Sequence, residues 1–280
     1  MYRTLVDVAV LAAHADDPQW VVVDCRHALA DFSRGRALYD EAHVPGAFFV
    51  DFERVLTGEK TGTNGRHPLP DPAQFASFLR SIGVNEATQL VAYDGGSDMF
   101  AARFWFCARW IGHTAVAVLD GGMKAWIAAG GPLGGAVPTP HSFGDIEARV
   151  NPEFVVDAAF VLTHLHDNAM TLVDARGADR FAGENETIDP VAGHIPGAVN
   201  RHYALNFEPD GRFKSPDELR EAYARLGRSS AVVHQCGSGV SGAVNLLAME
   251  HAALPGSRLY AGSWSEWVSD PARPTAQGSS

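Results

Sequence analysis

The chain has 280 residues, of which 46% are hydrophobic and 20% are charged, and its formal net charge is −11. This is the composition of an ordinary globular protein with one large or two ordinary domains. The negative charge argues against nucleic acid or an acidic membrane surface as the main partner. No stretch reaches the roughly 18 uninterrupted apolar residues of a membrane span.

The three cysteines are too few for a disulfide framework. Near the N-terminus, Asp7 interrupts the apolar residues, so no secretion signal is expected there. These two features predict a reducing compartment, the cytoplasm.

The first half of the chain alternates strand-like and helix-like segments. A short helix is expected over 6–14. Buried parallel strands are expected over 20–26, 90–94 and 115–119, because these runs are short, continuous and rich in β-branched residues. Another helix should begin after Asp71, a good N-cap followed by Pro72, and end at Gly83. Further helices are expected over 98–110 and 123–129.

The second half repeats the first. Residues 171–176 match 21–26, 193–198 match 42–47, 231–235 match 90–93, and 259–267 match 119–126. An offset of about 150 residues indicates duplicated domains and not a solenoid. We therefore predict two α/β domains, 1–133 and 152–280, with mainly parallel sheets flanked by helices. The segment 134–151, with several glycines and prolines, is predicted to link them.

One stretch of the second half combines an apolar run, a cysteine, a glycine-rich turn and a helix-like segment. The run ends at Cys236, and the turn is Gly237-Ser238-Gly239-Val240-Ser241-Gly242. A strand, tight loop and helix would direct backbone N–H groups at the bend. A cysteine there is expected to be a stabilised thiolate and a nucleophile, although many cysteines are inert core residues. Asp94 occupies the matching position of the first half, so that domain is predicted to be non-catalytic.

Two further patterns occur outside this loop. The first is aromatic-x-x-x-His-aliphatic-Pro-Gly-Ala over 39–47, echoed at 194–198. The second is Tyr-x-Gly-Ser-Trp-x-Glu-Trp over 260–267. Together with the cysteine loop, they resemble the rhodanese superfamily along nearly the whole chain. The resemblance implies two tandem rhodanese-like domains, of which the second is active. The loop itself is similar to the Cys-Gly-Ser-Gly-Val-Thr-Ala loop of 3-mercaptopyruvate sulfurtransferases, with Ser241 and Gly242 as departures.

The residues after the cysteine bear on the sulfur donor. Thiosulfate is a small dianion that cationic loop residues would hold, as in the Cys-Arg-x-Gly-Val loops of thiosulfate-type rhodaneses. Mercaptopyruvate carries its charge on a carboxylate some bonds away from its sulfur. An uncharged loop with an arginine further off favours mercaptopyruvate, and a thiosulfate:cyanide sulfurtransferase is the alternative.

The resemblance also implies a mechanism and residue roles. Cys236 would take the donor's sulfur as a persulfide, release pyruvate and pass the sulfur to cyanide, a small thiol or a thioredoxin-like protein, without cofactor or metal. Arg180 would bind the substrate carboxylate. The N–H groups of the loop would stabilise the anionic sulfur, and they belong to Gly237, Gly239, Val240, Ser241 and Gly242. An acid–His–Ser relay would comprise Glu53, His67 and Ser238.

Other residues are given structural roles or leave a question open. Arg176, His43 and His194 recur in both halves and are expected to be structural. Cys25 and Cys107 are expected to be buried and inert. The segment 183–190 has no arginine, which leaves open what replaces the family's second substrate arginine.

A phosphatase and a non-catalytic module are two more distant functions. A phosphatase loop of the type Cys-x5-Arg is excluded, because position 242 is glycine. A non-catalytic sulfur carrier or protein-binding module remains an alternative, although the cysteine that it would lack is present.

Overall fold

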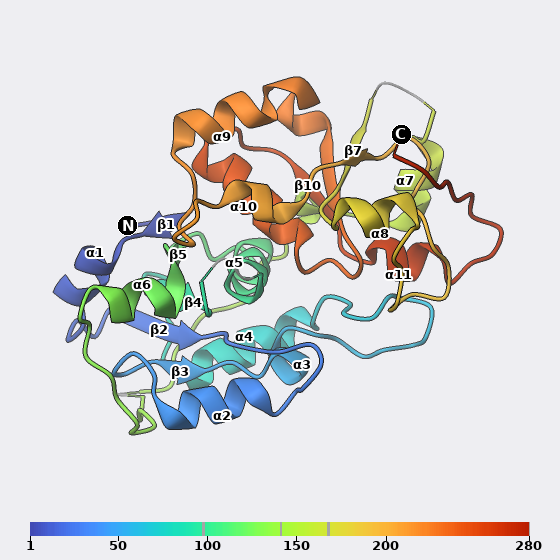
Figure 1. The fold of residues 1–280 in the computed structure, drawn as a ribbon. Coiled ribbons are helices and arrows are strands. Elements are labelled where there is room, and N and C mark those ends of the chain that lie inside the picture. The colour runs from blue at the N-terminus through green and yellow to red at the C-terminus, as the bar shows by residue number, and fades with distance from the viewer. Residues whose placement is uncertain (97–98, 141, 167–168, 280) are drawn as a thin grey trace. The chain divides into compact units, whose positions relative to one another are not determined.

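The computed structural model describes residues 1–280 except 97–98, 141, 167–168 and 280 (Figure 1). Its contacts define two compact units that interleave in sequence. The first comprises 1–58, 69–151 and 207–213, and the second comprises 59–68, 152–206 and 214–280. Segment 134–151 therefore groups with the first unit, and loop 59–68 groups with the second. The division of the sequence into two continuous domains, with boundaries at 133 and 151, stays a prediction.

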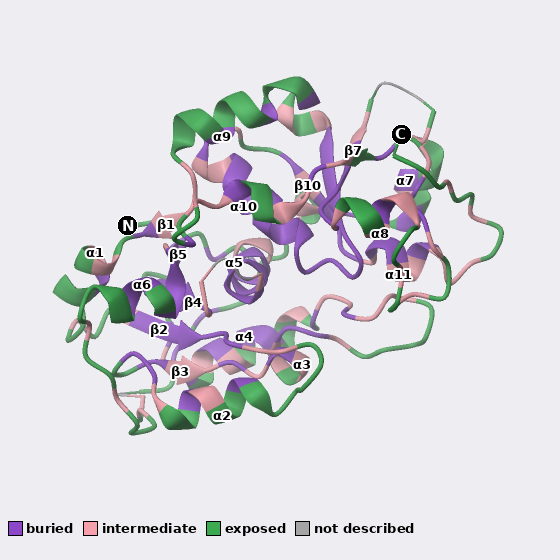
Figure 2. Cartoon of the chain, in the orientation of Figure 1, coloured by how far each residue is buried: buried purple, intermediate pink, exposed green. Residues whose placement is uncertain are grey.

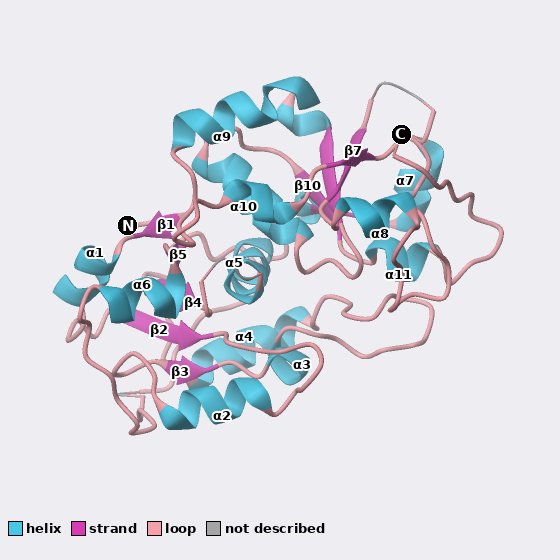
Figure 3. Cartoon of the chain, in the orientation of Figure 1, coloured by secondary structure: helices cyan, strands magenta, loops and turns pink. Residues whose placement is uncertain are grey.

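The first unit is a five-stranded sheet in the order β1-β5-β4-β2-β3, and its strand pairs are parallel. Strands alternate with helices along the chain (Figure 3). The elements are β1 (Leu5–Val6), α1 (Val8–Ala13), β2 (Trp20–Asp24), α2 (Arg34–Glu41), β3 (Phe48–Phe49), α3 (Phe52–Val55), α4 (Pro72–Ser81), β4 (Gln89–Tyr93), α5 (Phe100–Trp110), β5 (Val116–Leu119) and α6 (Gly122–Ala128).

The second unit has the corresponding order β6-β10-β9-β7-β8, again with parallel pairs. Its elements are β6 (Val155–Val156), α7 (Ala158–Thr163), β7 (Thr171–Asp174), α8 (Ala178–Ala182), β8 (Val199–Asn200), α9 (Pro216–Tyr223), β9 (Val232–Gln235), α10 (Gly242–His251), β10 (Arg258–Tyr260) and α11 (Ser263–Trp267). The fold class is therefore α/β with two parallel sheets flanked by helices, as predicted. The central strand β9 places Cys236 at its carboxyl end.

The helix boundaries follow their capping residues. The Asp71 side chain accepts a hydrogen bond from the backbone N–H of Gln74, and Pro72 opens α4 as predicted. The helix expected over 6–14 is shorter than predicted, because Val6 belongs to β1 and Asp7 caps α1. The helix expected from Asp98 runs from Phe100 as α5, and Asp98 itself lies outside the described residues.

Each sheet is covered by one helix that is buried almost all round. In α10, residues 242–249 are all buried, and in α5 residues 100–108 are all buried (Figure 2). Because these helices have almost no exposed face, they lack the polar stripe of a surface helix. None of the helices in the described ranges is both long and apolar enough to cross a membrane.

The two histidine motifs have the structural role that their recurrence predicts. His43 is buried, its Nδ1 lies 2.8 Å from the carbonyl oxygen of Tyr39, and its ring stacks on that tyrosine. His194 is buried in the same way, with Nδ1 2.9 Å from the carbonyl oxygen of Phe181 and its ring on that phenylalanine. Both histidines therefore tie a loop to the helix beside it.

Candidate active site at the end of the central strand

The predicted nucleophile lies where β9 ends and α10 begins. Cys236 is 2% exposed, and the loop that follows it is buried throughout. The backbone turns sharply at Gly239, which has φ of +74°; a Cβ there would lie 2.2 Å from the carbonyl oxygen of Ala261. Glycine is required at this position because both the conformation and the close approach exclude a side chain.

The segment that follows β10 holds the cysteine loop in place. The backbone N–H of Cys236 donates to Ser263 Oγ at 3.0 Å, and the N–H of Trp264 donates to the carbonyl oxygen of Cys236 at 3.0 Å. Ser263 adopts φ of +55°, which is unusual for a residue other than glycine. The sequence pattern over 260–267 marks this segment, but the support that Ser263 gives to the loop was not foreseen.

The environment of Cys236 separates it from the other two cysteines. Burial acts to raise the pKa of its thiol, but hydrogen bonds from the Ser241 hydroxyl and from the backbone N–H groups of Ser238 and Gly242 outweigh this effect. The net pKa is therefore lowered. Burial raises the pKa of Cys25 well above its usual value and raises that of Cys107 to about 11. Of the three thiols, only Cys236 is poised to ionise.

The structure brings together two of the three predicted relay residues. Nδ1 of His67 lies 2.8 Å from Ser238 Oγ, and both side chains are buried. His67 reaches this position from loop 59–68, which belongs to the second unit. Glu53 lies in α3 of the first unit, and its part in a relay stays a prediction.

Three arginines and three carboxylates form a connected cluster beside the loop. Arg176 makes a bidentate pair with Asp174 and donates to the carbonyl oxygen of Gly193, with its side chain 2% exposed. Arg26 makes the same pair with Asp24 in the first unit. The structural role predicted for Arg176 agrees with these contacts.

Arg180 extends from α8 and is 22% exposed. It donates to both carboxylate oxygens of Glu186, at 2.9 and 2.8 Å, and to Asp189 Oδ2 at 3.2 Å. Its guanidinium also approaches the loop, since Nη1 would be 3.6 Å from a Cβ on Gly237. The arginine predicted to bind substrate therefore lies beside the residue that follows the nucleophile.

A second guanidinium at the loop was missed. Arg66 forms an ion pair with Asp189, and its Nη2 would lie 2.9 Å from a Cβ on Gly237. The loop is uncharged, as predicted, but the expectation that arginine lies further off is wrong. No local signal identifies Arg66, because its segment reaches the second unit only in three dimensions.

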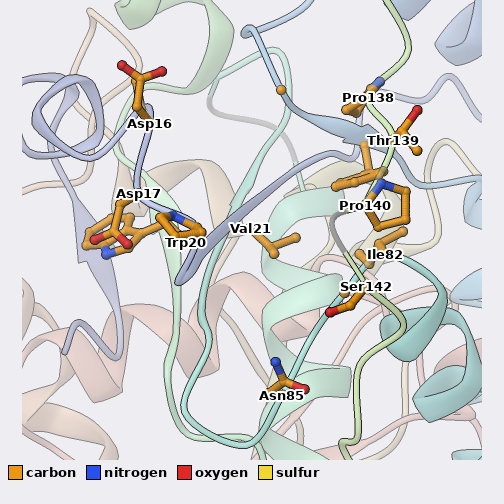
Figure 4. A pocket seen from close by; sticks show the side chains of 15 residues that line it. Asp16, Asp17, Trp20, Val21, Ile82, Asn85, Pro138, Thr139, Pro140 and Ser142 are labelled. Atoms are coloured by element: carbon orange, nitrogen blue, oxygen red, sulfur yellow. The ribbon is translucent and has the colours of Figure 1, made fainter.

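Two other features of the described residues bear on whether the chain has a second site. No group of three or more His, Cys, Asp or Glu side chains among them is arranged to hold a metal ion. The first unit has a cavity of about 520 Å³ with Asp16 and Asp17 on one side and Pro138 and Pro140 on the other (Figure 4). It is lined by neither cysteine, histidine nor arginine, so it offers no thiol for sulfur transfer and no guanidinium for an anion.

The chain is similar to known proteins along almost its full length. The rhodanese-like domain matches residues 7–129 and again 157–270. A Pseudomonas aeruginosa protein named "Probable 3-mercaptopyruvate sulfurtransferase" is 44% identical over 279 residues, which cover 98% of both chains. A rat protein named thiosulfate sulfurtransferase is 32% identical over 280 residues, covering 95% of this chain and 92% of the relative.

The likeness extends to solved structures. The crystal structure of SseA from Escherichia coli matches this chain with a TM-score of 0.82 and 34% sequence identity. That structure was described in terms of the rhodanese fold and catalytic mechanism of 3-mercaptopyruvate sulfotransferases. The match covers 94% of this chain and 99% of that one.

Fold, loop and similarity define a two-domain α/β protein with one cysteine loop. The chain belongs to the rhodanese-like domain family. It is a sulfurtransferase enzyme.

Proposed function

We propose that this enzyme takes sulfur from 3-mercaptopyruvate onto Cys236 and passes it, as the sulfane sulfur of a persulfide, to a thiol, a thioredoxin-like protein or cyanide. The observation that carries the choice of donor is the hydrogen bond between Ser238 and His67, directly beside the nucleophile. It supplies a proton-transfer pair, which mercaptopyruvate needs and thiosulfate does not.

The first half-reaction is a displacement at sulfur. The Cys236 thiolate forms an S–S bond with the donor's sulfur, and the C–S bond breaks with its electron pair left on carbon. Pyruvate's enolate forms and must take a proton to become pyruvate. Thiosulfate would instead release sulfite, which requires no proton on carbon. Ser238, backed by His67, is the proposed proton donor.

Two groups of contacts support this assignment. The lowered pKa of Cys236 favours the thiolate that begins the reaction. The hydrogen bonds that lower this pKa come from the loop and serve equally for a negatively charged persulfide or leaving thiolate. Arg180 is the proposed partner of the donor's carboxylate, because guanidinium and carboxylate form a bidentate pair.

The second half-reaction returns the enzyme to its starting state. An acceptor nucleophile attacks the outer sulfur of the persulfide, the S–S bond breaks, and the Cys236 thiolate is released. Cyanide becomes thiocyanate, and a thiol becomes a persulfide. The three cysteines are free and buried, which supports our proposal of a reducing compartment such as the cytoplasm.

The second candidate function is transfer from thiosulfate to cyanide. It is favoured by the guanidinium groups of Arg66 and Arg180 near Gly237, since cations at this place would hold a dianion.

The test compares kcat/KM for 3-mercaptopyruvate and thiosulfate with cyanide as common acceptor. A preference for mercaptopyruvate that is lost in Cys236→Ser and kept in Cys107→Ala is the expected result. A preference for thiosulfate would overturn the proposed donor. Activity retained in Cys236→Ser would overturn the nucleophile and revive the non-catalytic interpretation.

A further inference from the structure

We propose that the second unit binds an ordered water molecule inside its core, between the side chains of Asp174 and Gln235 and the backbone N–H of Ile195. This water takes the part that the hydroxyl of Tyr93 plays in the first unit. The site lies one residue before Cys236, and its chemistry is independent of the sulfur donor that the enzyme uses.

Tyr93 and Gln235 occupy corresponding places in the two sheets. Tyr93 is the last residue of β4 and pairs with Asp24 on β2, whereas Gln235 is the last residue of β9 and pairs with Asp174 on β7. In both units the N–H of the residue after the aspartate donates to the carbonyl oxygen of this last residue, at 2.7 Å in the first and 2.9 Å in the second. The tyrosine and glutamine side chains therefore start from equivalent points.

In the first unit the tyrosine hydroxyl joins two buried groups. It donates to Asp24 Oδ2 at 2.7 Å and accepts from the backbone N–H of Val44 at 3.1 Å. Asp24 and Val44 are both buried. The hydroxyl therefore satisfies a backbone donor and supplies one more hydrogen bond to a carboxylate that also pairs with Arg26.

The corresponding groups of the second unit have no such partner in the protein. Gln235 and Ile195 are both 0% exposed. Among the described residues, no protein atom forms a hydrogen bond with either end of the Gln235 amide or with the N–H of Ile195. On the same terms, Asp174 Oδ2 accepts from Arg176 alone. Buried polar groups are nearly always hydrogen-bonded, because an unpaired one costs free energy, so these three groups require a small polar ligand.

Trp264 replaces the bulk of the tyrosine ring but not its hydroxyl. In the first unit the guanidinium carbon of Arg26 lies 5.9 Å from the ring centre of Tyr93. In the second, the corresponding Arg176 lies 5.0 Å from the ring of Trp264. The indole N–H of Trp264 donates to a backbone carbonyl oxygen at 2.9 Å, so it does not supply the missing hydrogen bond to Asp174. A water molecule, which is about the size of a hydroxyl, completes the replacement.

Water suits these groups better than an ion does. The Asp174 carboxylate needs a donor, whereas the N–H of Ile195 needs an acceptor. An anion would be repelled by Asp174, and a cation would meet the N–H and the guanidinium of Arg176. Water donates one hydrogen to Asp174 Oδ2, accepts from Ile195 and uses its remaining capacity for the Gln235 amide, in the range of about three hydrogen bonds that buried waters usually make.

A high-resolution crystal structure of the full chain tests the site directly. The expected result is a well-ordered water within hydrogen-bonding distance of Asp174 Oδ2, Ile195 N and the Gln235 amide. The matched control is Gln89, a buried glutamine of β4 whose amide bonds to backbone groups of the protein, so it should hold no water. Electron density without a water at Asp174, or with the Gln235 amide bonded directly to protein groups, overturns the proposal.

Rebuilding the first unit's arrangement in the second gives an independent test in solution. The double variant Gln235→Tyr/Trp264→Met restores the tyrosine and the methionine that stand at positions 93 and 123 of the first unit. Its hydroxyl should displace the water, so the number of long-lived internal waters, measured by magnetic relaxation dispersion of the water nuclei, should fall by one. An unchanged number overturns the proposal. Matching far-UV circular dichroism verifies that the variant is folded.

The single variant Gln235→Tyr tests whether Trp264 has taken the place of the ring. Two large rings would then compete for one space, so this variant should melt at a lower temperature than the double variant, in which methionine makes room. A single variant that melts as high as the double one contradicts the exchange of ring for ring on which the water site rests.

Discussion

The loops that follow β4 and β9 occupy corresponding places in two similar sheets, but they hold different anions. In the first unit, Asp94 Oδ1 accepts from the N–H of Gly96 at 3.1 Å, and Oδ2 accepts from the N–H of Ala101 at 2.9 Å. In the second, the sulfur of Cys236 accepts from the N–H of Ser238 at 3.5 Å. The N–H groups of this bend bind an anionic side chain in both units. Only the anion of the second unit, the Cys236 thiolate, can form a bond to sulfur.

The supporting segments differ in the same way. The N–H of Met123 donates to the carbonyl oxygen of Asp94, just as that of Trp264 donates to Cys236. The residue before each has positive φ, +54° at Gly122 and +55° at Ser263. Serine there costs on the order of 1 kcal/mol in backbone strain. Its hydroxyl bridges Cys236 N and Tyr260 O, a contact that glycine cannot make.

The largest expected effect comes from giving the second loop the first loop's anion. Cys236→Asp should lower sulfur transfer by at least about 10³-fold, because a carboxylate cannot form a persulfide. Its melting temperature should stay close to that of the wild type, because the same N–H groups would bind the carboxylate. The comparison of the two loops fails if this variant unfolds while Cys236→Ser is stable.

Removing the proton-transfer pair should have the next largest effect. Ser238→Ala is expected to lower kcat with mercaptopyruvate by about 10²-fold, the usual size of a general acid's contribution. Turnover of thiosulfate should change far less, because sulfite leaves without a proton on carbon. Steady-state kinetics with both donors measure the difference, with Ser229→Ala as the matched serine control. Equal losses on both donors would contradict the assigned role.

Ser263 provides a smaller and more specific test. Ser263→Ala leaves the buried N–H of Cys236 without its hydrogen-bond partner, which costs about 1–3 kcal/mol of free energy in the loop. Because the loop positions the sulfur, kcat/KM should fall by about tenfold. Ser263→Gly removes the hydroxyl as well as the strain and should be more stable than Ser263→Ala, yet no more active. Recovery of activity in the glycine variant would show that the hydroxyl is dispensable.

The smallest effect is a shift in the pH profile of alkylation. Because the pKa of Cys236 is lowered, its thiolate persists to lower pH than an ordinary thiol's, and iodoacetamide should modify it first as pH rises. Cys25 and Cys107, whose pKa values are raised, should react only at more alkaline pH. Peptide mass spectrometry measures all three rates. Ser241→Ala should move the Cys236 profile to higher pH, and a shift in the opposite direction would contradict the stated cause.

The fold and the buried cysteine loop were predictable because their signals are local. Continuous β-branched runs and a glycine-rich turn after Cys236 identify a strand, loop and helix without reference to the rest of the chain. The two-residue strands β1, β3, β6 and β8 are too short to show any period.

The remainder of the site depends on contacts between distant segments. His67 and Ser238 are 171 positions apart, and only the resemblance connected them. No sequence signal linked Arg66 or Ser263 to the loop. An arginine or a serine gives the same signal in sequence whether its side chain faces solvent or packs against the cysteine loop.

The absence of an exposed face over residues 242–249 of α10 bears on how the enzyme moves. A helix with no solvent side cannot fray without opening the core, so its amides should be among the slowest to exchange with deuterium. The N–H of Gly242 lies at the start of this buried helix and hydrogen-bonds the sulfur of Cys236. The backbone N–H groups around the sulfur therefore keep their positions between turnovers, and each catalytic cycle begins without reorganisation of the backbone.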